Sequence, residues 1–292
     1  MTIFLQALFS GLALGAVYAL IALGYSVIFS TLKMGHFAQG EFYMLGALCG
    51  LILSTSFASM PVALVFLFSG LAVSAAMLIL ERIAYRPLYN RPSNYLLIAT
   101  IAMQYIVQYL VRLLWGSEYA KSPELFENKI FTFGPVVVTM QNLAVIGISA
   151  ALMIVLTIFM KKTKTGIAMS AVSMNRRAAS MMGVKISTII AATYIISAFL
   201  AAVAGCLMGP VYSVVYHMGT TMGNKAMVAA VMGGFGTLPG AMLGGLLLGV
   251  AETLCGVYIS ATYKEIVSFF ILIAVLMIRP QGILGKKSIM KV

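Results

Sequence analysis

The sequence predicts an all-α, polytopic membrane protein of about eight transmembrane helices plus one broken or re-entrant glycine-rich segment. Hydrophobic residues make up 62% of the 292 residues and charged residues only 9%, whereas a soluble domain has about 25% charged residues. Lipid must therefore solvate most of the surface. The apolar residues also fall into runs of about 20 residues, the helix length that crosses a bilayer core of about 30 Å. We expect residues 1–292 to form a single transmembrane domain.

Eight apolar runs are candidates for complete membrane spans. Helices are the expected form, because lipid offers no hydrogen-bond partner to the backbone of an open strand. In order along the chain, the expected spans are residues 4–30, 38–57, 61–80, 95–115, 142–160, 188–208, 240–258 and 265–279.

A further apolar segment, residues 222–238, is shorter and is interrupted by glycine and proline. The segment contains Gly233, Gly234 and Gly236 and is followed by Pro239. These residues leave backbone N–H and C=O groups without helical hydrogen bonds, and lipid cannot supply the missing partners. This segment is therefore expected to be buried in protein or to line a cavity. Transporters commonly place their pathway at discontinuous helices of this kind.

The basic residues predict the orientation of the spans. The chain has 19 Lys and Arg residues against 7 acidic residues, and the connection at residues 161–187 holds several basic residues and no acidic one. The positive-inside rule places this connection in the cytoplasm, together with residues 81–94 and the tail from Arg279. We therefore expect a cytoplasmic C-terminus.

The remaining connections follow from alternation of the spans. The loop at residues 116–141 must then face outward, and so must the N-terminus. The turn that holds Lys33 and His36 is expected on the cytoplasmic side.

Glycines four residues apart predict close packing of two helices. The first span has Gly11 and Gly15, and the penultimate span has the pairs Gly240 with Gly244 and Gly245 with Gly249. This spacing lets two backbones approach closely. Residues 11–20 and 245–254 are also similar in sequence and run in opposite predicted directions, which fits either an inverted repeat or two helices built from the same few residue types.

Ionisable residues within the spans are scarce, and each is expected to have a partner, a cavity or a place near the interface. The chain has no Asp. Glu252 lies near the middle of its span, where a pathway role and a structural pair are both open, and Glu41 begins its span, where it also fits helix capping. Gln104 and Gln108 lie one turn apart and face either a pore or a neighbouring helix. The candidate pathway residues are Gln39, Glu41, Gln104, Gln108, Gly233, Gly234, Gly236 and Glu252.

The cytoplasmic connection contains an amphipathic helical pattern over residues 165–183. Apolar residues recur at spacings of three or four and form one face of a helix. Such a helix either lies on the membrane surface or docks into a groove of another protein. The apolar face comprises Ile167, Ala171, Met174, Ala178 and Met181.

Part of this helix resembles a known family. The segment Arg177-Ala178-Ala179-Ser180-Met181-Met182-Gly183 is similar to the EAA-xxx-G coupling segment of bacterial ATP-binding-cassette (ABC) importer permeases, with Arg177 where many permeases have Glu. Other passages resemble LivH-type subunits of the branched-chain amino acid permease family. These passages are residues 15–24, 37–47, 225–236, 239–241 and 279–282.

The resemblance implies a permease subunit in the bacterial inner membrane that works with four other parts: a second homologous permease, two cytoplasmic ATPases and an external binding protein. It implies no cofactor, metal or catalytic residue in this chain. The sequence has no GxxxxGK[ST] phosphate-binding loop, so energy must come from a partner. The coupling helix would include Arg176, Arg177, Ala178, Ala179 and Gly183.

The sequence leaves the substrate and one alternative function open. Gly35 and Gln39 depart from the family pattern Asn-Phe-Ala-His-Gly-Glu, and urea, amide and other amino acid permeases share much of that pattern, so the substrate is not fixed. The alternative function is an ion-coupled secondary transporter or channel, which would need intramembrane acids or histidines. A membrane enzyme is disfavoured because no HExxH or GxSxG motif occurs.

Overall fold

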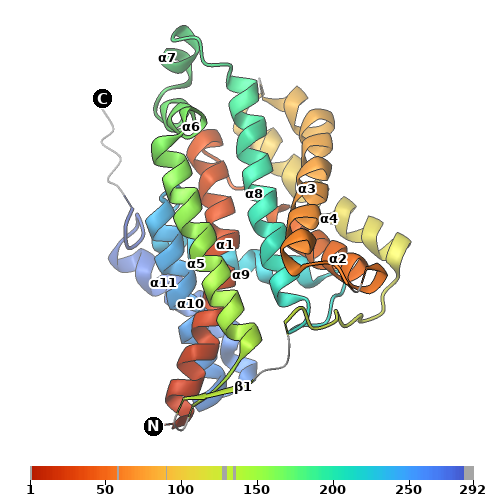
Figure 1. Cartoon of the computed structure of the whole chain (residues 1–292). Coiled ribbons are helices and arrows are strands. Elements are labelled where there is room, and N and C mark those ends of the chain that lie inside the picture. The colour runs from red at the N-terminus through yellow and green to blue at the C-terminus, as the bar shows by residue number, and fades with distance from the viewer. Residues whose placement is uncertain (1, 58, 90, 127–129, 134–135, 286–292) are drawn as a thin grey trace.

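The computed structural model describes residues 2–57, 59–89, 91–126, 130–133 and 136–285. Residues 127–129 of the expected outer loop and the tail lysines Lys286, Lys287 and Lys291 lie outside these ranges. Within them the fold is an elongated bundle of helices around the long helix α1 (Figure 1). Seven of the described helices are long and apolar enough to cross a membrane.

The helices begin and end within a few residues of the expected spans. They are α1 (Thr2–Leu32), α2 (Gln39–Ser56), α3 (Val62–Leu80), α4 (Ser93–Trp115), α5 (Met140–Lys162), α6 (Lys164–Met174), α7 (Arg176–Met181), α8 (Ile186–Met208), α9 (Met218–Gly234), α10 (Leu238–Tyr258) and α11 (Lys264–Ile278). Short helical turns occupy Glu81–Tyr85 (η1), Arg86–Leu88 (η2) and Ala261–Tyr263 (η3).

A small hairpin at the N-terminal end of the bundle was not expected from the sequence. Strands β1 (Ile130–Phe133) and β2 (Val136–Thr139) pair antiparallel, with Ile130 opposite Thr139. Each strand is only four residues long, too short for an alternating pattern to stand out from the apolar runs around it.

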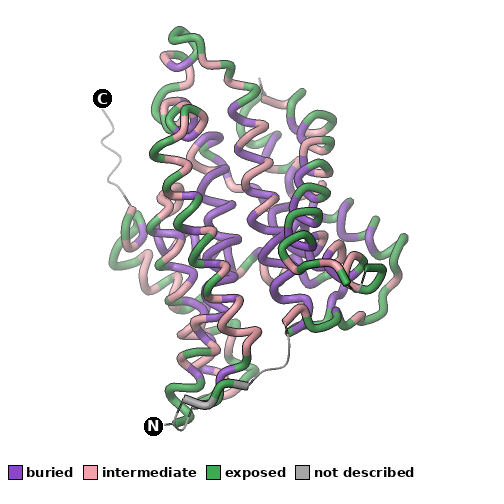
Figure 2. Tube along the Cα trace, viewed as in Figure 1, coloured by how far each residue is buried: buried purple, intermediate pink, exposed green. Residues whose placement is uncertain are grey.

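Helices α1 and α10 form the predicted glycine seam and run antiparallel. A Cβ atom added at Gly11 would lie 2.8 Å from Val250 Cα, and one at Gly15 would lie 2.8 Å from Leu246 Cα. Backbone therefore meets backbone along this seam, which confirms the packing role of these glycines. Figure 2 shows the consequence, a buried α1 at the centre and more exposed helices such as α11 outside.

Helices α2 and α9 both begin inside the bundle rather than at its ends. The Gln39 side chain, at the start of α2, lies beside Gly24 of α1 and reaches Ser197 at the middle of α8. The start of α9 meets the same point, because Gly40 packs directly on Gly219 and Gly223. Helix α2 has 18 residues and α9 has 17, and neither is among the seven helices that are both long and apolar enough to cross a membrane.

The turn between α1 and α2 differs from its expected place at the cytoplasmic surface. Lys33 is exposed there, but the chain then folds back inward and His36 is fully buried. Its ring lies 5.3 Å from the rings of Tyr85 and Tyr194, measured between centroids. Because α2 starts at mid-depth, the turn must enter the protein to reach it.

The expected single helix over residues 165–183 is divided into α6 and α7. Asn175 separates them with an extended backbone (φ −155°, ψ 107°), and its side-chain oxygen accepts a hydrogen bond from the Ala178 N–H. Asparagine favours this capping geometry over helix continuation. The inward face is formed by Met169, Val172 and Ala179.

Candidate functional site

Helix α9 contacts several of the polar side chains found inside the bundle, Glu41, Gln104 and Glu252 among them. It is short because glycines end it: Gly234 and Gly236 adopt positive φ angles (117° and 86°), and Pro239 follows in the first turn of α10. The carbonyls of Met232 and Gly233 accept hydrogen bonds from the backbone amides of Ile283 and Leu284. The broken end of α9 is thus buried in protein, one of the two arrangements that its sequence predicts.

A chain of hydrogen bonds joins α4, α9 and α2. Gln104 Nε2 donates to Thr220 Oγ1 at 3.2 Å, and the Thr220 hydroxyl donates to Glu41 Oε1 at 2.9 Å. Glu41 is fully buried, and its Oε2 atom has no hydrogen-bond donor among the described residues. The carboxylate lies where the N-terminal ends of α2 and α9 meet, and their helix dipoles favour negative charge at that point.

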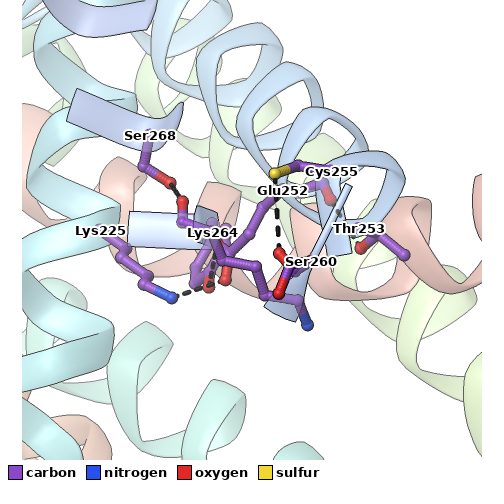
Figure 3. A network of polar contacts seen from close by, with 9 residues as sticks. Lys225, Glu252, Thr253, Cys255, Ser260, Lys264 and Ser268 are labelled. Atoms are coloured by element: carbon purple, nitrogen blue, oxygen red, sulfur yellow. Dashed lines mark hydrogen bonds and ion pairs between the residues drawn. The ribbon is translucent and has the colours of Figure 1, made fainter. Parts of the chain in front are cut away.

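A buried ion pair joins α9 to α10 and α1. Lys225 Nζ lies 2.6 Å from Glu252 Oε1, with side-chain exposures of only 13% and 4%. Tyr18 Oη donates to the other carboxylate oxygen at 2.9 Å. Figure 3 shows Lys225 extending across to Glu252. The pair supplies the structural partner that an intramembrane Glu requires.

A small polar cavity lies between α9 and α11. Its volume is about 120 Å³. It is lined by Thr220, Thr221, Asn224, Lys225 and Val228 of α9 and by Glu265, Ser268 and Phe269 of α11. Because Thr220 and Lys225 belong to the two networks above, the cavity adjoins both of them.

The structure gathers some of the predicted pathway residues and separates others. Glu41, Gln104 and Glu252 converge on α9, and Gln39 donates a hydrogen bond to the Ser197 carbonyl at 3.0 Å. Gln108 is buried one turn after Gln104. The three glycines lie at the opposite end of α9 from Thr220, with Gly233 against Gly240, Gly234 against the C-terminal segment and Gly236 beside Phe29.

Sequence reasoning missed the polar face of α9. Lys225 lies within the predicted segment 222–238 but is not among the candidate pathway residues predicted from the sequence. The available signal was spacing: Thr220 and Asn224, like Thr221 and Lys225, are four residues apart and share one helix face. A lysine in such a segment calls for an acidic partner, and Glu252 lies in the next helix.

The coupling residues predicted from the sequence occupy distinct environments. Arg176 Nε and Nη2 donate to the Thr31 carbonyl at 3.3 and 2.8 Å. Arg177 is exposed, and Ala179 is buried against α6 and α8. The backbone N–H of Ala178 donates the capping hydrogen bond to the Asn175 side chain. Gly183 has a φ of 85°, which suits glycine.

The outer tip of this segment carries exposed methionines. Met174, Met181 and Met182 are 87%, 82% and 85% exposed. Met174 ends α6 and Met181 ends α7. Helix α7 lies at the end of the molecule opposite the N-terminus (Figure 1). In the part of the chain that the structure describes, no group of three His, Cys, Asp or Glu side chains comes together to hold a metal ion.

Comparisons with known proteins bear on this arrangement. Residues 7–276 match the family described as the branched-chain amino acid transport system / permease component. The chain is 40% identical to the high-affinity branched-chain amino acid transport system permease protein LivH of Salmonella typhimurium, over 99% of this chain and 98% of that protein. It is 39% identical to LivH of Escherichia coli and 38% identical to BraD of Pseudomonas aeruginosa, each over 99% and 98%.

A solved structure shares the fold. The chain aligns with PsaBC from Streptococcus pneumoniae in complex with Fab at a TM-score of 0.51 and 13% identity, covering 96% of this chain and 93% of that one.

Proposed function

This chain belongs to the branched-chain amino acid transport system permease family, and from that membership we propose that it is the membrane-spanning subunit of an ABC importer for branched-chain amino acids. The observation that carries the proposal is the match of 38–40% identity to three such permeases over nearly their full length. The chain is a multi-pass inner-membrane protein, with seven described helices of membrane-spanning length.

The partners are those that membership of the family supports. Two cytoplasmic ATPases supply the energy and an external binding protein delivers the substrate. A second, homologous permease completes the membrane part as a heterodimer. The basic connection at 161–187 and the tail from Arg279 face the cytoplasm, where the ATPases are.

The methionine tip is the surface that meets an ATPase. Met174, Met181 and Met182 are flexible apolar side chains held away from the bundle, whereas the other face of α6 and α7 is already packed. Methionine adapts well to a hydrophobic groove. A surface helix lying on lipid would instead need its apolar face level with the membrane, but α7 lies beyond the end of α8 (Figure 1).

Conformational coupling passes from this tip into the bundle. Arg176 holds α7 to the last turn of α1, and α1 leads into the buried turn that begins α2. Closure of the ATPases would shift α7, and this contact would carry the shift toward the meeting point of α2 and α9. The substrate pathway follows the polar face of α9, where Glu41, Gln104 and Glu252 converge.

Co-purification tests the coupling surface. Met181→Asp with Met182→Asp places charge on side chains that touch little of this chain, so the permease should still insert and fold. We expect the ATPases to be lost from the purified complex while the second permease is retained. Lys121→Glu in the outer loop is the matched control and should retain all subunits. Full retention of the ATPases by the double variant would overturn the coupling assignment.

A further inference from the structure

The cavity between α9 and α11 combines opposite charges with an apolar wall. Lys225 lines it from α9 and Glu265 lines it from α11. Its other polar groups are the hydroxyls of Thr220, Thr221 and Ser268 and the side-chain amide of Asn224. Val228 and Phe269 supply the apolar part. A volume of about 120 Å³ is several times the space that one water molecule needs. The cavity therefore admits a small solute with two opposite charges and an apolar group.

Both charged groups have bonding capacity left. A lysine ammonium has three N–H donors, and Glu252 occupies one of those of Lys225. Glu265 lies in the first turn of α11, where a carboxylate is favoured, and it makes no hydrogen bond or ion pair with any other described side chain. The ammonium donor of Lys225 is thus on α9 and the carboxylate acceptor of Glu265 is on α11, and both line the same cavity.

We propose that this cavity binds a zwitterionic α-amino acid during passage through the membrane, an inference that rests on the proposed importer function. The substrate ammonium pairs with the Glu265 carboxylate. The substrate carboxylate accepts hydrogen bonds from Lys225 Nζ and from the Thr221 hydroxyl and Asn224 amide. The branched side chain lies against Val228 and Phe269.

Other ligand classes fit these walls less well. A metal cation prefers several oxygen ligands with negative charge, and here one carboxylate faces a lysine. An inorganic anion would meet the Glu265 carboxylate, and a neutral sugar would leave this exposed carboxylate without a cationic partner. The zwitterion is the class whose two charges match both walls.

Occupancy of the cavity would be sensed by the two networks beside it. Thr220 lines the cavity and hydrogen-bonds Glu41, and Lys225 lines it and pairs with Glu252. A substrate carboxylate at Lys225 would compete with Glu252 for the ammonium. Binding would therefore alter contacts between α9 and both α2 and α10.

The test uses the complete importer in lipid nanodiscs without its binding protein. Thr221→Cys places a thiol in the cavity, and its rate of modification by a water-soluble thiol reagent is measured, with the parent chain giving the background of Cys49, Cys206 and Cys255. Leucine should slow the modification in a saturable way. Its deaminated acid, 4-methylpentanoate, and its decarboxylated amine, 3-methylbutylamine, should protect much less because each lacks one charge.

Glu265→Gln tests the ammonium partner. It should raise the leucine concentration for half-protection by about tenfold, which corresponds to the loss of ~1.4 kcal/mol. Protection by the anionic 4-methylpentanoate should not weaken, because Glu265→Gln removes a like charge from the cavity. Glu265→Asp should restore part of the protection, and Glu118→Gln in the outer loop is the control that should change nothing. Direct binding of radiolabelled leucine to the Glu265→Gln and unmodified complexes gives the same comparison without the cysteine.

Each contrary outcome has a separate meaning. Absence of leucine protection in a complex whose ATPase activity still responds to the binding protein would overturn the cavity assignment and leave the importer function standing. Equal protection by leucine and both single-charge analogues would also overturn it. An ATPase that never responds to the binding protein would instead remove the proposed function, and this inference with it.

Discussion

Arg176, the first residue of α7, donates two hydrogen bonds to the backbone carbonyl of Thr31 in the last turn of α1. The guanidinium group thus caps the C-terminal end of α1, the most deeply buried helix. Unpaired carbonyls and the helix dipole favour a cation at such an end. The neighbouring Arg177 is exposed and makes no such contact. Two adjacent arginines therefore have different tasks, one within the permease and one at its surface.

Loss of the Arg176 contact should uncouple ATP hydrolysis from transport. In Arg176→Ala, α7 would move without pulling on α1, so we expect fewer leucine molecules taken up per ATP hydrolysed in proteoliposomes. Arg176→Lys keeps the positive charge but not the planar guanidinium group, and it should recover part of the leucine-to-ATP ratio. Arg177→Ala is the matched control. An unchanged ratio in Arg176→Ala, with the complex intact, would contradict the transmission role.

Removing only one partner of the Lys225–Glu252 pair should lower the stability of the permease. Glu252→Gln leaves a buried lysine without its counter-charge, a change that typically costs about 3–5 kcal/mol. The thermal unfolding midpoint of the purified permease should fall by several degrees. The double variant Glu252→Gln with Lys225→Met removes both charges and should regain much of that loss. A double variant no more stable than the single one would argue against direct pairing.

The α1–α10 seam should have no space for a side chain at the position of Gly15. A Cβ there would lie 2.8 Å from Leu246 Cα, a backbone atom that has no room to move. We expect Gly15→Val to lower stability by at least about 1–3 kcal/mol and to reduce the yield of folded protein in size-exclusion chromatography. Gly147→Ala on α5 meets no atom within 4 Å and should be neutral or slightly stabilising. Equal effects of the two variants would refute the seam.

Thr220→Val should disconnect Glu41 from Gln104 while keeping the size of the side chain. The buried carboxylate would lose its hydroxyl donor, at a cost of about 1–3 kcal/mol. We expect a lower thermal midpoint and slower leucine uptake. Thr220→Ser retains the hydroxyl and should behave like the unmodified protein. If the valine and serine variants are indistinguishable, the hydrogen-bond chain has no role.

The positions of the helices were predictable because lipid imposes a simple rule. Apolar runs must match the bilayer thickness, so the expected span at 188–208 corresponds to α8 at Ile186–Met208, and 240–258 corresponds to α10 at Leu238–Tyr258. The glycine seam was predictable because GxxxG spacing places small residues on one helix face and lets two helix backbones approach closely.

What sequence reasoning missed depends on long-range or single-residue effects. The division of the cytoplasmic helix depends on one capping side chain, Asn175, within an otherwise continuous apolar pattern. The burial of His36 follows from the mid-depth start of α2, which only the packing of Gly40 on α9 reveals. Pairing of Lys225 with Glu252 requires knowing that α9 and α10 fold against each other.

Uptake of radiolabelled leucine into proteoliposomes tests the central claim most directly. The complex would contain this permease, its homologous partner and two ATPases, with ATP inside the vesicles and the binding protein outside. The importer function predicts accumulation that requires both ATP and the binding protein and that does not depend on a proton or sodium gradient. Uptake driven by an ion gradient without ATP would contradict the account and favour an ion-coupled transporter.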